Sequence, residues 1–151
     1  MNNSAVNIAN LLYSYAEKMD GGDLEGAAAL FRHARIKGSD PDKLLDAAGI
    51  LEQWKRYIKI YPDGTPRTKH LVTNPIIDID ELAGTATSRS YYTVIQSAEG
   101  FPLQPIASGR YHDRFERVDG IWRFSYRDYS LLDMVGDLSC HLKVKVPHAD
   151  R

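Results

Sequence analysis

The sequence predicts an α+β domain in which three N-terminal helices pack on a strongly curved, mainly antiparallel sheet. Apolar residues recur at helical spacing up to about residue 61, and after Pro66 the pattern changes to long extended segments separated by turns. Segments of twelve or more residues exceed the usual strand length of about five or six, so they must twist and bend. A bent sheet with helices across its mouth encloses a cavity, which gives a cone-shaped barrel.

The first two helices are predicted near the N-terminus. Apolar residues at helical spacing indicate a helix over residues 4–19, with Ser4 as a plausible N-cap and an end at Asp20, where two glycines follow. Asp23 then caps a second short helix over residues 24–31, which is rich in alanine and leucine.

A third helix is predicted to open at Asp40-Pro41, because an N-cap residue followed by proline favours a helix start. Its apolar positions continue to Tyr61, and the Pro62-Asp63-Gly64 turn ends it. A brief strand is expected over residues 33–38.

Four long strands follow, and Asp119-Gly120 is the strongest turn signal between them. Two residues that tolerate positive φ suit the tight turn of a hairpin, so the last two strands are predicted to pair. Bulges are expected near Pro75 or Gly109. The predicted strands cover residues 68–79, 83–98, 105–118 and 121–132.

Composition narrows the class of partner. The chain has 151 residues, the length of one domain, with a core expected over about 4–133 and a C-terminal tail over 134–151. Its 19 basic and 20 acidic residues form no long block, which argues against nucleic acid and anionic membranes as partners. No signal peptide or membrane span is recognisable, and Cys140 is the only cysteine, so a cytoplasmic protein with a small-molecule ligand is expected.

The segment from Ser108 to Arg127, which reads SGRYHDRFERVDGIWRFSYR, resembles the closing hairpin of SnoaL-like proteins in the nuclear-transport-factor-2-like superfamily. Three further stretches agree with this resemblance: residues 15–20 with the turn that follows them, residues 68–74 and residues 86–96. The resemblance implies the cone-shaped fold over nearly the whole chain.

The resemblance also implies a catalytic pair. In dehydratases and dehydrohalogenases of this superfamily, an aspartate at the end of the first helix hydrogen-bonds a histidine on the first long strand, and Asp20 and His70 match that context. Alternation places Thr68, His70 and Val72 on one face of the strand, although alternation alone does not say which face is concave. The simpler interpretations are a turn aspartate and an ordinary strand histidine.

Two further residues are catalytic candidates by resemblance. Tyr15 has the spacing of a pocket tyrosine in bile-acid 7α-dehydratase-like members, and a core aromatic is the alternative. Arg127 resembles the pocket arginine of hexachlorocyclohexane dehydrochlorinase-like members. Strict alternation groups Arg127 with Ser125 and Tyr129, so a place on a solvent-facing or subunit-facing surface stays open.

Aromatic and apolar residues are candidates for the lining of the substrate pocket, although core packing would give the same pattern. No metal is expected, because His33, His141 and His148 lack ligand-like spacing, and no cofactor is expected, because the chain has no phosphate-binding loop or nucleophile elbow. The candidate lining residues are Trp54, Tyr57, Tyr92, Val94, Tyr111 and Tyr129.

The leading functional hypothesis is a cofactor-independent lyase, a dehydratase or related eliminating enzyme that acts on a small cyclic hydrophobic substrate. A non-catalytic binding or scaffolding protein is one alternative, and a ketosteroid isomerase-like or polyketide cyclase-like enzyme is another. The superfamily further implies a homo-oligomer, a trimer or a dimer, in which the tail after Leu138 could take part in the contact.

Overall fold

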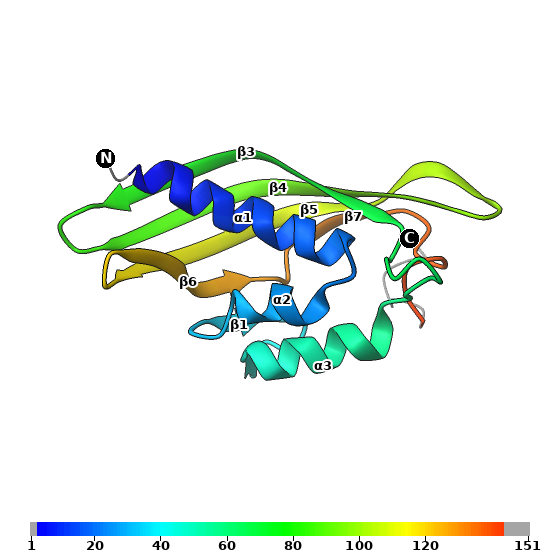
Figure 1. The fold of residues 1–151 in the computed structure, drawn as a ribbon, viewed down its shortest axis with the longest axis horizontal. Helices are drawn as coiled ribbons and strands as arrows, with labels where there is room; N and C mark the ends of the chain where they lie inside the picture. Colours follow the sequence, from blue (N-terminus) through cyan, green and yellow to red (C-terminus); the bar gives the residue numbers. More distant parts are fainter. Residues whose placement is uncertain (1–2, 144–151) are drawn as a thin grey trace.

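The computed structural model describes residues 3–143 and has the predicted α+β architecture, with helices packed on a mostly antiparallel sheet (Figure 1). The helices are α1 (Ser4–Asp20), α2 (Leu24–Ala29) and α3 (Ala47–Tyr57). The strands are β1 (Arg35–Lys37), β2 (Leu44–Leu45), β3 (Thr68–Asp80), β4 (Thr85–Ala98), β5 (Phe101–Val118), β6 (Ile121–Asp128) and β7 (Leu132–Val135).

The seven strands form one sheet in the order β2-β1-β6-β5-β4-β3, and β7 pairs with β5 beyond the end of β6. All neighbours are antiparallel except β1 and β6, which run parallel. Among the strands of residues 3–143, β3 and β2 end the path without pairing with each other, so the sheet is curved and open rather than a closed barrel.

Turn and bulge residues set the register of the long strands. Asp119 and Gly120 both have positive φ, 51° and 78°, and join β5 to β6 as the predicted two-residue hairpin. The register of β3 against β4 shifts between Thr73 and Ile76, at the predicted bulge near Pro75. A further bulge opposite Arg114, where the register of β5 against β6 shifts, was not predicted.

The third helix begins later than predicted. Asp46 caps it by accepting a hydrogen bond from the Gly49 N–H at 2.8 Å, whereas Leu44 and Leu45 pair with β1 as strand β2. Backbone pairing with β1 therefore outweighs the helix-start pattern at Asp40-Pro41. The other boundaries differ by smaller amounts: Asn3 rather than Ser4 caps α1, and α2 ends at Ala29.

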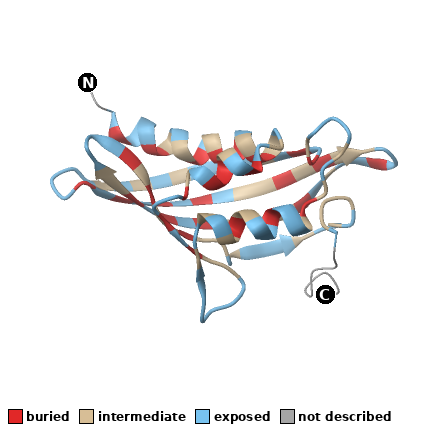
Figure 2. Cartoon of the chain, turned by 60° about the horizontal axis from the view of Figure 1, so that its bottom comes forward, coloured by how far each residue is buried: buried red, intermediate tan, exposed pale blue. Residues whose placement is uncertain are grey.

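The main core lies between α1 and the concave face of the sheet. Helix α1 turns Ile8, Leu12 and Tyr15 toward the strands, and none of the three has measurable exposed surface. Buried residues accordingly recur on the side of α1 that faces the sheet and at intervals along the strands (Figure 2). A smaller cluster of Val94, Phe101 and Ile106 fills the other end of the sheet, near the C-terminal segment. Within residues 3–143, no helix combines the length and apolar character needed to cross a membrane.

The described part of the predicted tail packs on the chain itself. The Gly136 N–H donates to the Ile106 carbonyl at 2.8 Å, and the Lys143 N–H donates to the Tyr57 carbonyl at 2.8 Å. Residues 138–143, which we name the strap, thus lie beside the end of α3 and the loop that leads into β3. The rest of the tail, including His148, lies outside the described residues.

Substitution of Gly22 tests how the turn after α1 is fixed. Gly22 has a φ of 79°, and a Cβ there would overlap the Gly64 carbonyl oxygen, which is backbone. We expect Gly22→Ala to lose about 1–2 kcal/mol of unfolding free energy from the positive φ and a further 1–3 kcal/mol or so from the overlap, measured by urea unfolding.

Gly120→Ala is the matched control for this substitution. Gly120 has nearly the same φ, 78°, but nothing lies within 4 Å of an added Cβ, so only the first penalty applies. Equal losses for the two variants would show that the contact between Gly22 and Gly64 does not constrain the turn.

Candidate active site

The last residue of α1 and the first residues of β3 meet in a nearly buried hydrogen-bonded pair. Nδ1 of His70 lies 2.6 Å from Oδ1 of Asp20, and the exposed fractions of the two side chains are 6% and 8%. The His70 backbone N–H donates to the other carboxylate oxygen at 2.7 Å, and the Thr68 hydroxyl donates to Oδ1 at 2.9 Å. Three donors therefore compensate a carboxylate that the helix dipole disfavours at this end of a helix.

The pairing fixes the protonation pattern of the histidine ring. Because a carboxylate only accepts hydrogen bonds, Nδ1 of His70 carries the proton toward Asp20, and in the neutral ring Nε2 keeps its lone pair. Burial follows the alternation of β3: Thr68 is buried, His70 and Val72 are partly buried, and Lys69 and Leu71 are exposed. The face that carries His70 is thus the concave one.

Tyr15 is the centre of an aromatic cluster beside this pair. Its hydroxyl lies 2.9 Å from the Tyr129 hydroxyl, and its ring meets the His70 ring edge-on at a centroid distance of 6.1 Å. Tyr111 and Trp54 contact the same ring at centroid distances of 5.8 and 6.1 Å. Tyr15 is therefore both a core aromatic and a neighbour of the dyad.

The candidate lining residues on the sheet gather around Tyr111. The Tyr92 ring stacks on the Tyr111 ring at a centroid distance of 4.3 Å, and the Tyr129 ring stacks on it at 6.1 Å.

Burial raises the pKa of Tyr15 and of Tyr111 well above the ordinary value, so both phenols stay protonated hydrogen-bond donors at neutral pH. Val94 faces His70 across the β3–β4 register, and Tyr57 is partly buried at the end of α3.

Arg127 is fully buried inside the cone and not on an outer surface. Its guanidinium donates two hydrogen bonds to Asp113, at 2.7 and 3.1 Å, and stacks over the Tyr111 ring at 3.8 Å from the centroid. Burial disfavours the charge, but the attraction of Asp113 outweighs it and keeps the pKa of Arg127 above its ordinary value. Nη1 of Arg127 has no hydrogen-bond partner among the described residues.

The strict alternation of inward and outward side chains expected along β6 was wrong beyond Phe124. Phe124 pairs with Phe115, but Tyr126 pairs with Arg114, so Ser125 is the extra residue of a bulge. The bulge inverts the faces that follow it and brings Arg127 onto the inward face, opposite Asp113.

Two residues near the site were not singled out from the sequence. Asp113 shares the inward face of β5 with Tyr111 and Phe115, and an acidic residue among buried aromatics is a sign of a buried cationic partner. His141 gave no such sign, because only the folding back of the strap brings it near the dyad. Burial, and then repulsion from His70, lowers the pKa of His141 to about 4, against the opposing attraction of Asp20.

One surface cleft reaches Asp20 of the dyad, although His70 is not part of its lining. It has a volume of about 330 Å³, and Asp20, Thr68 and Gln96 are part of its lining, together with Arg67 and Lys69. Within residues 3–143, no three His, Cys, Asp or Glu side chains come together as a group that could hold a metal ion.

A family model for the SnoaL-like domain matches residues 3–128, which include the dyad, the buried ion pair and the aromatic cluster except Tyr129. The chain belongs to the SnoaL-like family. This family is part of the nuclear-transport-factor-2-like superfamily, as the resemblance of the hairpin and of β3 implied. No curated protein is significantly similar in sequence to this SnoaL-like domain.

Solved structures share the fold of this SnoaL-like domain. A nuclear-transport-factor-2-like protein with a cystatin-like fold from Novosphingobium aromaticivorans aligns with a TM-score of 0.66 at 18% identity over 90% of this chain and 85% of its own. A candidate scytalone dehydratase from the same organism gives 0.65 at 24% identity over 88% and 86%. The β subunit of a candidate aromatic-ring-hydroxylating dioxygenase, also from that organism, gives 0.64 at 15% over 92% and 95%. At these identities the similarity establishes the fold alone.

Removal of the Arg127 charge tests the buried ion pair of this SnoaL-like domain. In Arg127→Met, Asp113 stays buried without its cation, which is expected to cost about 3–5 kcal/mol of unfolding free energy at pH 7. Burial raises the pKa of Asp113. Because the pKa of this carboxyl is raised in the folded state, the loss of unfolding free energy is largest at pH values above the ordinary pKa of aspartate. The loss shrinks as pH falls to about 4, where the carboxyl becomes protonated. Denaturant unfolding at pH 7 and pH 4 measures both effects.

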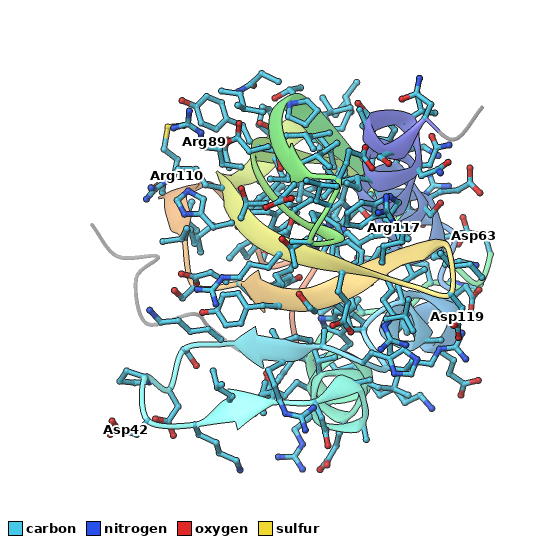
Figure 3. The ribbon with its side chains drawn as sticks, turned by 90° about the vertical axis from the view of Figure 1, so that its left-hand side faces the viewer. Asp42, Asp63, Arg89, Arg110, Arg117 and Asp119 are labelled. Carbon is cyan, nitrogen blue, oxygen red and sulfur yellow. The ribbon has the colours of Figure 1, made fainter. Side chains whose placement is uncertain are left out.

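Arg110→Met is the matched control, because Arg110 makes the same two-bonded contact with Asp133, at 2.8 and 3.0 Å, in an exposed setting. Arg110 projects on the side of the sheet away from α1 (Figure 3). We expect little change in stability and little dependence on pH for this variant. An equal loss in both variants would contradict a special role for burial.

Proposed function

We propose that this SnoaL-like protein is a cofactor-independent lyase, a dehydratase or related eliminating enzyme, whose substrate is a small cyclic hydrophobic molecule. The observation that carries the proposal is the 2.6 Å contact between Asp20 and His70 in a nearly buried setting. A base oriented by a carboxylate and screened from water can remove a carbon-bound proton beside a leaving group.

In the proposed reaction, Nε2 of His70 removes a proton from the carbon next to a ring carbonyl. The electron pair of that C–H bond forms a C=C bond as the β-hydroxyl leaves, and the imidazolium of His70 gives the abstracted proton to the departing hydroxide, which becomes water. The Tyr15 phenol and the unpaired Nη1 of Arg127 can donate hydrogen bonds to the oxygen on which negative charge develops. Asp20 stabilises the imidazolium of His70 while it holds the proton.

The aromatic surroundings support a ring-bearing substrate. Tyr15 and Tyr111 are buried, whereas Tyr92 and Tyr129 keep part of their surface exposed, so a planar ligand can stack on the exposed side of this cluster. The candidate substrate-binding residues thus remain Trp54, Tyr57, Tyr92, Val94, Tyr111 and Tyr129.

A binding or scaffolding role is the second candidate. The Tyr15 hydroxyl already has Tyr129 as partner, and Arg127 is paired with Asp113, so the groups that would assist catalysis also serve the core. An isomerase or cyclase with a carboxylate base on the sheet is less well supported. Asp113 is the inward carboxylate of β5, and its two hydrogen bonds with Arg127 oppose a role as base.

Self-association as a trimer or dimer and a cytoplasmic location are further parts of the proposal. The outer face of the sheet carries exposed apolar side chains, among them Leu71, Tyr91 and Met134, which supports a subunit contact. The balance of 19 basic and 20 acidic residues offers no basis for nucleic acid or membrane partners.

Turnover of a simple cyclic β-hydroxyketone tests the lyase. The first probe is 3-hydroxy-1-tetralone, which loses one water and tautomerises to fluorescent 1-naphthol. We expect His70→Gln to lower kcat/KM by about 10²–10⁴-fold, the usual contribution of a general base, and Asp20→Asn to lower it in the same direction. Fluorescence of the product follows the reaction, and related cyclic hydroxyketones extend the panel.

His33→Gln is the control for this experiment, because His33 is exposed in the turn after α2. It should retain wild-type turnover. If no hydroxyketone of the panel is converted, or if His70→Gln is as active as the wild type, the lyase proposal is wrong.

A further inference from the structure

The strap of residues 138–143 lies against the end of the concave face where the dyad is found. The Lys59 N–H donates to the His141 carbonyl at 2.8 Å, and Ile58 forms a β-bridge with Leu142. The Gln96 side chain donates to the Cys140 carbonyl at 3.0 Å. These contacts fix the backbone on both sides of His141.

The same contacts bring His141 close to the dyad. Gln96, which holds Cys140, faces Thr68 in the β3–β4 register, and Thr68 donates to Asp20. The charge states of His70 and Asp20 both influence the His141 ring. His141 therefore belongs to the surroundings of the dyad, although it is far from Asp20 and His70 in the sequence.

One ring nitrogen of His141 is buried without a hydrogen-bond partner among the described residues. Nδ1 has no hydrogen-bond partner among residues 3–143 and almost no contact with solvent. Buried polar atoms in native proteins are almost always hydrogen-bonded, so an unpaired nitrogen near the Asp20–His70 pair is a candidate contact for a ligand.

We infer that His141 is a second histidine of the site, and that its Nδ1 hydrogen-bonds an oxygen substituent on the ring-bearing ligand held beside His70. The inference rests on the proposed site and on a ligand with a ring oxygen, but it does not require that the ligand undergoes elimination.

The two histidines have separate tasks in this arrangement. Burial, together with repulsion from His70, holds the pKa of His141 at about 4, so its ring is neutral at pH 7. A neutral imidazole of such low basicity is a poor proton acceptor but still a good hydrogen-bonding group. His141 is therefore a positioning residue that orients the ligand, and His70 remains the base.

Side chains that replace one ring nitrogen at a time test this inference. Asparagine places a polar atom near the position of Nδ1, glutamine places one near the position of Nε2, and leucine provides neither. The probe is 1-naphthol, and its dissociation constant is measured by fluorescence titration. We expect His141→Gln and His141→Leu to weaken binding by about 3–10-fold, the usual range for one hydrogen bond, and His141→Asn to stay near the wild-type affinity.

His33→Gln should bind 1-naphthol like the wild type. Thermal unfolding of each variant identifies any that fails to fold, and in that case the wild type decides by NMR. Addition of 1-naphthol should shift the ring signals of His141 and His70 over the same concentration range. Equal affinities for the Asn, Gln and Leu variants, no saturable binding of 1-naphthol, or His141 signals that do not move would each overturn the inference.

The lyase proposal can fail independently of this inference. If 1-naphthol binds with the expected order of affinities but no hydroxyketone is converted, His141 is a ligand contact in a binding protein. If turnover depends on His70 but is indifferent to all three substitutions of His141, the enzyme proposal stands and the inference falls.

Discussion

The hydrogen bonds that Asp20 accepts from β3 hold the structure of the site together. A helix that ends in a carboxylate needs donors at that end, and the first residues of β3 supply three of them. The same contacts dock the C-terminal end of α1 on the edge strand of the sheet. The carboxylate that anchors the helix therefore also orients the His70 ring.

A second constraint acts at the centre of the cone, where Arg127 and Asp113 form a buried ion pair among aromatic rings. Such a pair is costly to bury and still more costly to break, so it favours one register of β5 against β6. The bulge at Ser125 makes the pairing geometrically feasible. Polar contacts at the end of α1 and at the centre of the sheet thus define which side chains can surround a ligand.

Much of this arrangement could be predicted from local patterns. Asp119-Gly120 predicted the hairpin because few residue pairs tolerate positive φ at two consecutive positions. The change of hydrophobic period after Pro66 predicted the long strands. The start of α3 directly after its N-cap Asp46 could not be predicted, because pairing of Leu44 and Leu45 with β1 is a tertiary effect. The inward turn of Arg127 depends on a bulge, and the position of His141 depends on the strap, and neither has a local sequence pattern.

The contacts that build the site join residues that are far apart along the chain. Tyr15 and Tyr129, whose hydroxyls are in contact, are 114 residues apart in the sequence, and Asp20 and His70 are 50 residues apart. Closing such long loops is entropically expensive, and proteins rich in distant contacts fold slowly. A partly folded chain with its helices formed would still lack a ligand site, so the ability to bind should arise only in the final, cooperative step of folding.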